Sequence, residues 1–176
     1  MLLEKKINLD NKENKLIDLV MGVTFPWFLM YQLSNLQKYK FFGHMLMARF
    51  EPRDIAARGI PNSILFERFE KIFINFCNEN NIKVNNILRM ALNNTWHYDD
   101  KHGDIHVDHD FPHYNFIWYI NDFTKGSTYI YEKDYKTLKK EIKAEKNKVV
   151  VFGGEPHAQG FCNPYENRIV FVATFN

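Results

Sequence analysis

Residues 146–157 read Lys-Asn-Lys-Val-Val-Val-Phe-Gly-Gly-Glu-Pro-His, and this stretch says most about the fold. Its centre, residues 148–152, is a short and nearly continuous run of β-branched and aromatic residues, which is typical of a buried strand. Gly153 and Gly154 then favour a turn, because glycine adopts backbone conformations that other residues avoid. His157 is therefore expected just beyond the end of a strand.

Similar runs occur on both sides of this stretch. Clusters of Gly, Asn, Pro and charged residues separate them, as expected for a β-sandwich or barrel. An amphipathic helix is predicted after Pro61, because apolar residues recur there at steps of three and four. Asn62 or Ser63 is its expected N-cap, and residues 78–81 are its expected end. A shorter helix is expected at residues 14–21. The predicted strands are residues 40–50, 87–92, 116–120, 127–131, 148–152 and 169–175, and the apolar face of the longer helix consists of Leu65, Phe66, Phe69, Ile72, Phe73 and Phe76.

The element order predicts an α+β fold that is mainly β, with a helical layer first and a β-rich core second. A length of 176 residues suits a single domain, residues 1–176. Residues 1–84 form its mixed, partly helical part, and residues 85–176 form the core that carries the candidate site.

The composition narrows the function classes. A net charge of +2 gives no strong sign of a nucleic-acid or membrane partner. No apolar run approaches the roughly 20 residues of a membrane span, and residues 1–10 lack a signal-peptide core. Two cysteines, Cys77 and Cys162, make no disulfide framework. We therefore expect a soluble cytoplasmic protein.

Residues 132–148 are a mixed-charge run with seven lysines. Such a run is typical of a solvated hairpin or a short exposed helix. A flap that faces the substrate is the alternative.

Histidines gather in one segment, since five of the seven lie between His97 and His113, among several aspartates. Mixed imidazole and carboxylate groups are candidate metal ligands. His106-Val107-Asp108 places two ligand types at positions i and i+2, which point to the same face if the segment is a strand. They would supply two ligands of a 2-His-1-carboxylate triad, which leaves metal positions open for oxygen and a cosubstrate.

The third ligand has to be a histidine from elsewhere in the chain. Outside the cluster only His44 and His157 remain, and His157 is favoured by its place at a strand end. His102-Gly103-Asp104 is a rival to His106-Val107-Asp108. Valine suits a strand whereas Gly103 suits a turn, so the second motif is preferred.

Arg168 opens the last predicted strand, eleven residues after His157. A guanidinium can hold a carboxylate through two parallel hydrogen bonds. An arginine at this offset could therefore bind the distal carboxylate of 2-oxoglutarate.

These motifs together resemble the prolyl-4-hydroxylase-like branch of the 2-oxoglutarate/Fe(II)-dependent dioxygenases, especially small phage and bacterial members. The resemblance covers most of the chain. It departs at residues 125–128, Lys-Gly-Ser-Thr, where the family usually has Gly-Gly-Glu-Thr. The segments that carry it are residues 87–89, 106–108, 119–121, 125–128 and 146–152 with His157 and Arg168, and more loosely residues 25–27 and 42–44.

The resemblance implies a double-stranded β-helix (jelly-roll) core with N-terminal helices packed on one sheet. It implies Fe(II) held by His106, Asp108 and His157, with 2-oxoglutarate as cosubstrate and O2 as oxidant. Around 2-oxoglutarate it implies Arg168 on the distal carboxylate, with Tyr119, Thr128 and Asn93 lining the pocket.

The implied activity is a hydroxylase that couples decarboxylation of 2-oxoglutarate to succinate with hydroxylation of a substrate C–H bond. The substrate is an unidentified small molecule or peptide, and peptidyl proline is one option. His109, Asp110 and His113 could line the pocket mouth, hold the metal ligands in place by hydrogen bonds, or be plain surface residues. Aspartate at position 108 argues against halogenation, because related halogenases leave that position free for halide.

Two alternatives stay open. A non-catalytic jelly-roll binding module would be marked by loss of a ligand or of the arginine, and neither is lost. A zinc hydrolase could use the same triad, but no general-base glutamate is evident near the cluster.

Overall fold

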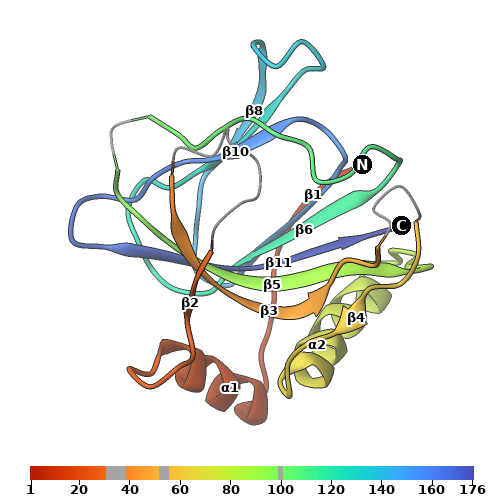
Figure 1. Ribbon diagram of the computed structural model, residues 1–176, viewed down its shortest axis with the longest axis vertical. Helices are drawn as coiled ribbons and strands as arrows, with labels where there is room; N and C mark the ends of the chain where they lie inside the picture. Colours follow the sequence, from red (N-terminus) through yellow and green to blue (C-terminus); the bar gives the residue numbers. More distant parts are fainter. Residues whose placement is uncertain (31–38, 52–55, 99–100) are drawn as a thin grey trace.

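The computed structural model describes residues 1–30, 39–51, 56–98 and 101–176. Within these residues the chain is mainly β, with antiparallel sheets and two helices (Figure 1). No helix in these ranges is long and apolar enough to cross a membrane.

A large antiparallel sheet forms the frame of the molecule. Its strands lie in the order β1-β9-β6-β11-β5-β3-β2, with β4 beside β3. Strands from the two halves of the chain therefore share one sheet, and β11 lies at its centre between β5 and β6. The strands are β1 (Leu2–Lys6), β2 (Phe28–Met30), β3 (Phe41–Ala48), β4 (Ile60–Pro61), β5 (Ile87–Trp96), β6 (Tyr114–Tyr119), β9 (Lys148–Gly153) and β11 (Asn167–Phe175).

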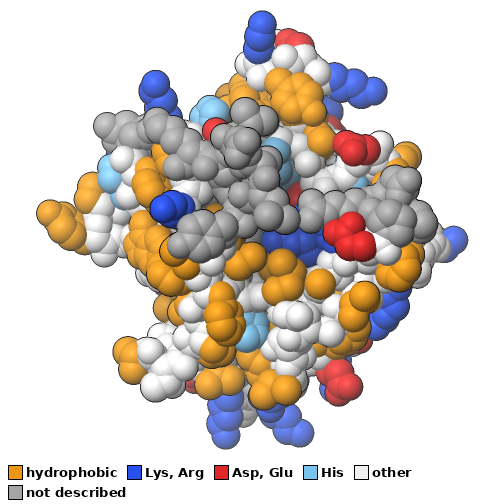
Figure 2. Space-filling view, in the orientation of Figure 1, with side chains coloured by type: hydrophobic (Ala, Val, Ile, Leu, Met, Phe, Trp, Pro, Cys, Tyr) orange, Lys and Arg blue, Asp and Glu red, His pale blue; other side chains and the backbone are white. Residues whose placement is uncertain are grey.

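A smaller sheet faces one side of the large one. It contains β10 (His157–Gln159), β7 (Thr128–Tyr131) and β8 (Leu138–Ile142), in that order. Two isolated β-bridges, His102 to Gly160 and His106 to His157, extend it by placing residues 102–106 beside β10. The β7–β8 hairpin projects from the body, and basic side chains stand at its tip (Figures 1 and 2). The hairpin expected in residues 132–148 is therefore present with shifted bounds, because its first strand is β7 and its second strand ends at Ile142.

Two helices, α1 (Asn11–Met21) and α2 (Phe66–Glu79), cover the other side of the large sheet (Figure 1). The apolar face of α2 is buried against the sheet, as its periodicity predicts. Phe69 stacks on Phe171 with ring centroids 5.3 Å apart, and Phe73 meets Phe116 edge-on at 5.1 Å. Most of the buried hydrophobic residues in the described chain belong to this outer core, and burial of such side chains is the main source of stability.

The inner face of the large sheet, toward the small sheet, differs in character. Alternate residues of β11 point to it, and Val170 belongs to its small apolar cluster with Ile117 and Tyr119. By the same alternation Arg168 and Thr174 also face inward. The inner face therefore combines a modest apolar core with buried polar groups.

Several sequence expectations are corrected in detail. The first helix begins at Asn11, because Asp10 forms a capping box with Glu13. The second helix has Leu65 as N-cap, so Asn62 or Ser63 was the wrong expectation; Ser63 Oγ instead accepts a hydrogen bond from the Leu65 amide at 3.1 Å. The order of a helical layer before a β core is also wrong, because β1 precedes α1 and joins the large sheet.

Candidate metal centre

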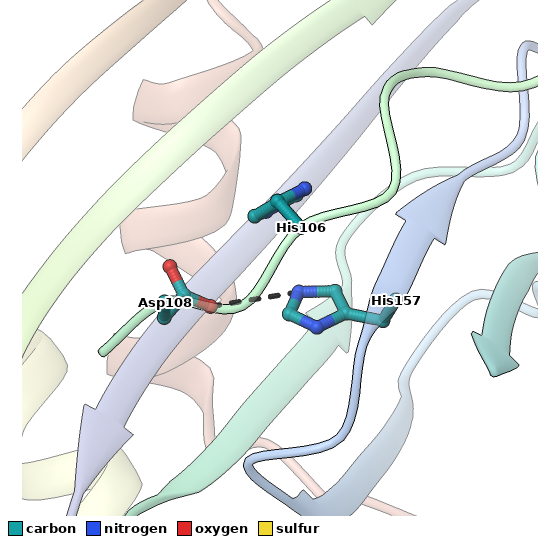
Figure 3. A group of neighbouring side chains, drawn as sticks. All are labelled: His106, Asp108 and His157. Atoms are coloured by element: carbon teal, nitrogen blue, oxygen red, sulfur yellow. Dashed lines mark ion pairs between the residues drawn. The ribbon is translucent and has the colours of Figure 1, made fainter. Parts of the chain in front are cut away.

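His106, Asp108 and His157 converge at the inner side of the small sheet. One potential ligand atom from each lies within 4.8 Å of the others, and Figure 3 shows the three side chains turned toward one another. Reciprocal backbone hydrogen bonds join the two histidines, from His106 N to His157 O at 3.0 Å and from His157 N to His106 O at 2.9 Å. Backbone hydrogen bonds thus hold His157 beside the segment that carries His106 and Asp108.

The expectation that His106 and Asp108 share a regular strand is wrong. His106 takes part only in an isolated bridge, and Asp108 lies in the bend that follows. Asp108 instead reaches the centre because its side chain is held from the other sheet, as described below.

The other candidate ligands lie outside this group. His102 Nε2 is 2.9 Å from the Tyr131 hydroxyl, so His102 belongs to a separate polar contact. His44 packs on the helical side, with Nδ1 3.0 Å from Pro26 O and Nε2 2.7 Å from Ser63 Oγ. Both nitrogens of His44 are therefore occupied by structural contacts.

Hydrogen bonds orient the imidazoles of the two converging histidines. Nδ1 of His106 lies 2.9 Å from Asp104 O, and Nδ1 of His157 lies 3.0 Å from Glu155 O. A neutral imidazole that donates its Nδ1 proton to a carbonyl keeps a free lone pair on Nε2. His157 Nε2 accordingly faces Asp108 Oδ2 at 3.5 Å. Two imidazole nitrogens and one carboxylate oxygen form a donor set that suits Fe(II).

Arg49, at the end of β3, fixes the carboxylate of Asp108. Its Nη2 donates to Asp108 Oδ1 at 3.0 Å and to Asp108 O at 3.1 Å. One carboxylate oxygen therefore faces His157 while the other is turned away from it (Figure 3). Burial would raise the pKa of Asp108, but the neighbouring His157, His106, Arg89 and Arg49 together hold that pKa well below its usual range.

His157 is prepared to bind a metal at neutral pH. Burial, together with the nearby His106, lowers the pKa of His157 to about 4. A histidine with this pKa is neutral at pH 7, and only neutral imidazole can ligate a metal.

A second cluster surrounds Arg168, which is 2% exposed. Its Nε donates to Gly126 O at 3.1 Å and its Nη2 to Thr128 Oγ1 at 3.4 Å. The guanidinium carbon lies 5.5 Å from the centroid of the Tyr119 ring, and the Tyr119 hydroxyl is 2.6 Å from Thr128 Oγ1. The structure thus brings together three of the four residues expected around 2-oxoglutarate.

The Arg168 guanidinium has only neutral partners in the described part of the chain. Burial lowers the pKa of Arg168, since the charged form loses its hydration. A buried cation without a counter-ion is costly. The cluster is therefore suited to receive an anion.

The loop before β7 positions one of these contacts. Gly126 adopts a φ of +67°, and a Cβ there would meet the Phe123 ring at 2.6 Å. Only glycine fits this turn, and the turn presents Gly126 O to Arg168.

Asn93 is the fourth expected residue of this pocket. It lies on β5 opposite Val170, which in turn lies opposite Tyr119, so the three share the inner face. Its Oδ1 atom is buried and has no hydrogen-bond partner. Asn93 thus faces the same interior but does not bond to the Arg168 cluster.

The segment after Asp108 packs against β11 and against the segment before β6, next to the candidate metal centre. His109 Nε2 lies 2.9 Å from Thr174 Oγ1, and its ring meets that of the buried His113 at 4.9 Å. Burial, with Arg49 nearby, lowers the pKa of His109 to about 4. Asp110 is exposed.

Sequence reasoning missed Arg49 and Arg89. Arg89 interrupts the apolar run of β5, which was a usable signal for a residue of the inner face. Arg49 gave no such signal, because its role depends on a contact 59 residues along the chain.

Comparison with known proteins supports the fold through structure alone. No family model matches the chain, and no curated protein matches it by sequence. Among solved structures, it is similar to a 2OG-Fe(II) oxygenase family oxidoreductase from Burkholderia pseudomallei, with TM-score 0.72 and 11% identity over 99% of this chain and 84% of that one.

Two further solved structures resemble the chain. One is the protein OsALKBH1, with TM-score 0.61 and 15% identity over 99% of this chain and 97% of that one. The other is a Pseudomonas putida prolyl-4-hydroxylase, with TM-score 0.59 and 9% identity over 99% and 92%. The chain therefore has the fold of the 2OG-Fe(II) oxygenases, which confirms the expected resemblance.

Proposed function

We propose that this protein is an Fe(II)- and 2-oxoglutarate-dependent oxygenase that hydroxylates a substrate C–H bond. One observation carries the proposal. A complete two-histidine, one-carboxylate donor set faces the same interior as a buried arginine that has no acidic partner in the described residues. The first group suits Fe(II), and the second suits the distal carboxylate of 2-oxoglutarate.

The winding of the chain supports a double-stranded β-helix as the scaffold. From β5 onward, successive segments belong to the large, small, large, small, small, large, small and large sheet. These segments are β5, residues 102–106, β6, β7, β8, β9, β10 and β11. Alternation between two facing sheets is how a jelly roll is wound.

In this proposal each residue has a defined task. His106 and His157 bind the metal through Nε2, and their Nδ1 bonds to carbonyls prevent ring rotation. Asp108 binds through the oxygen that faces His157, while Arg49 holds the other oxygen. When bound, iron would activate O2, the oxidant whose reduction balances both the decarboxylation of 2-oxoglutarate to succinate and the hydroxylation of the substrate.

The Arg168 cluster binds and orients the cosubstrate. Arg168 already donates to Gly126 O and Thr128 Oγ1, so its fork is rigid before an anion arrives. A carboxylate would gain hydrogen bonds from the remaining guanidinium protons and from whichever hydroxyl, of Tyr119 or Thr128, does not donate in the bond between the two. Such prior order lowers the entropic cost of binding.

A single preparation separates this proposal from a zinc hydrolase and from a non-catalytic binding module. The protein is purified without oxygen, its metal is measured, and succinate release is followed after Fe(II), 2-oxoglutarate and O2 are added. The proposal predicts one Fe(II) per chain and slow succinate release without substrate. A chain that keeps zinc and forms no succinate would favour the hydrolase, and one that binds no metal would favour the binding module. A turnover screen of free amino acids and peptides, peptidyl proline included, then addresses the substrate.

A further inference from the structure

Arg89 lies on β5 and points to the inner face of the large sheet. Its cross-strand partner on β11 is Thr174, at the end of the strand opposite to Arg168. Arg89 is half-buried, and among the described residues its guanidinium makes no hydrogen bond or ion pair. Because a partly buried guanidinium usually has a partner, this one is unusual.

Arg49 provides a second guanidinium at the same end. It binds Asp108 only through Nη2, and its Nε atom is buried with no hydrogen-bond partner. The Asp108 carboxylate thus accepts a hydrogen bond from only one nitrogen of Arg49 and none from Arg89.

The contacts of His109 place both arginines at one location. His109 directly follows Asp108, the partner of Arg49, and its Nε2 lies 2.9 Å from Thr174 Oγ1. Thr174 is the residue opposite Arg89. Consistent with this proximity, burial and the nearby Arg49 lower the pKa of Arg89 to about 10.

This arrangement holds more positive than negative charge. Two guanidinium groups lie near a single carboxylate, which bonds to only one of them, Arg49, and is also a proposed metal ligand. The Arg168 cluster lies six residues away along β11 and has its own task, so 2-oxoglutarate does not account for Arg89. Like-charged groups that lack hydrogen-bond partners lower the stability of the fold. Such groups are typical of functional sites.

We propose that Arg49 and Arg89 form a second oxyanion site beside the metal centre, which binds a carboxylate or phosphate of the substrate. Calling that ligand the substrate rests on the function proposed above. A planar fork with free donors matches either group. The free donors are the buried Nε of Arg49 and the whole guanidinium of Arg89. The substrate is thus an anionic molecule, bound with its charge toward the end of β11 that holds Thr174.

A purely structural role fits Arg49 better than Arg89. Arg49 bonds to Asp108 and could serve only to position it. Arg89 makes no hydrogen bond or ion pair among the described residues. It acts on Asp108 only through its charge, so it does not hold that carboxylate in place. The test is therefore built on Arg89.

The probe is inorganic phosphate, titrated into the isotope-labelled full-length protein while the arginine Nε–H signals are followed by NMR. The titration is run twice, on metal-free protein and on protein loaded with Zn(II) and 2-oxoglutarate, which occupy the metal and Arg168 sites. We expect saturable, millimolar binding that shifts the Arg49 Nε–H signal in both forms. Acetate in the same titration distinguishes a carboxylate site from a phosphate site.

The Arg89→Met variant should weaken phosphate binding at least tenfold, and Arg89→Lys should restore part of it. Arg58→Met is the matched control, because Arg58 already pairs with Glu70 at 2.7 Å; its phosphate affinity should equal that of the wild type. Equal affinity in Arg89→Met, or no shift of the Arg49 signal, would overturn the oxyanion site. If 2-oxoglutarate fails to bind the wild type, the proposed function fails instead, and the metal-free titration still decides the site.

Discussion

The two faces of the large sheet are built from different kinds of residue. On the outer face, aromatic and aliphatic side chains from α1 and α2 pack on the strands in the larger of the two hydrophobic clusters. On the inner face, a small apolar cluster is flanked by buried or half-buried Arg168, Arg89 and Asp108. The difference indicates that packing on the outer face provides most of the folding stability. The buried polar and charged groups of the inner face lower that stability and are available for binding.

The largest expected effect lies on the outer face. Phe73 is fully buried and contacts Phe116 and Phe175 at 5.1 and 5.3 Å between ring centroids. Phe73→Ala should lower the free energy of unfolding by about 3–5 kcal/mol, because it leaves a cavity. Urea denaturation measures this change. Ile64→Ala, at a residue that is 97% exposed, is the control and should change little.

Arg168→Ala tests the inner face. It should weaken 2-oxoglutarate binding by about 2–5 kcal/mol, the usual cost of truncating one partner of a buried charge pair. Iron binding should persist, because the donor set does not include Arg168. Titration of the anaerobic Fe(II) protein with 2-oxoglutarate gives the affinity. Unchanged affinity would remove Arg168 from the cosubstrate site.

The pH dependence of the metal-free protein should also come from the inner face. The pKa of His157 falls to about 4 in the folded protein from an ordinary value of 6.5. Between these values the unfolded chain binds a proton that the folded chain does not, so stability falls as pH drops from 6.5 to 4. The loss from His157 should be about 3 kcal/mol. Above pH 6.5 the residue contributes no pH dependence.

Denaturation curves at several pH values check this expectation. His157→Gln should reduce the slope between pH 6.5 and 4 without abolishing it, because the pKa of His109 is also lowered to about 4 in the folded protein. His97→Gln, outside the donor set, is the control. An unchanged slope in His157→Gln would assign the pH dependence to other groups.

The sequence predicted the outer face better than the inner one. The spacing of Phe69, Phe73 and Phe76 is a local property, so the helix and its buried face could be read directly. The strand β1 was missed because it lies at the sheet edge and is largely exposed, which leaves no apolar pattern. The expected strand across His106 and Asp108 was wrong, since those residues are placed by long-range contacts.

In the candidate site, too, residues with a distinctive local pattern could be predicted, and residues placed by long-range contacts could not. His106, Asp108, His157 and Arg168 could be proposed because their residue types and spacing are distinctive, and the structure brings the first three together. Arg89 could have been placed on the inner face because it interrupts the apolar run of β5, but neither its role nor that of Arg49 could be assigned, because an arginine acquires such a role only from its neighbours in the folded chain.

The smallest expected effect is a change in stability caused by a substitution on the inner face. Arg89→Met should stabilise the metal-free protein by roughly 1 kcal/mol, because it replaces a half-buried cation that lies near another cation. Thermal unfolding without added anions measures the difference. A destabilised variant would mean that Arg89 is a structural residue.

The central claim is that His106, Asp108 and His157 hold Fe(II) next to 2-oxoglutarate. The most direct measurement is the visible spectrum of anaerobic protein to which Fe(II) and then 2-oxoglutarate are added. A metal-to-ligand charge-transfer band should appear in the wild type only when both are present, and it should be absent in His157→Ala and Asp108→Ala. A wild type that develops no such band, or an equal band in both variants, would contradict the account.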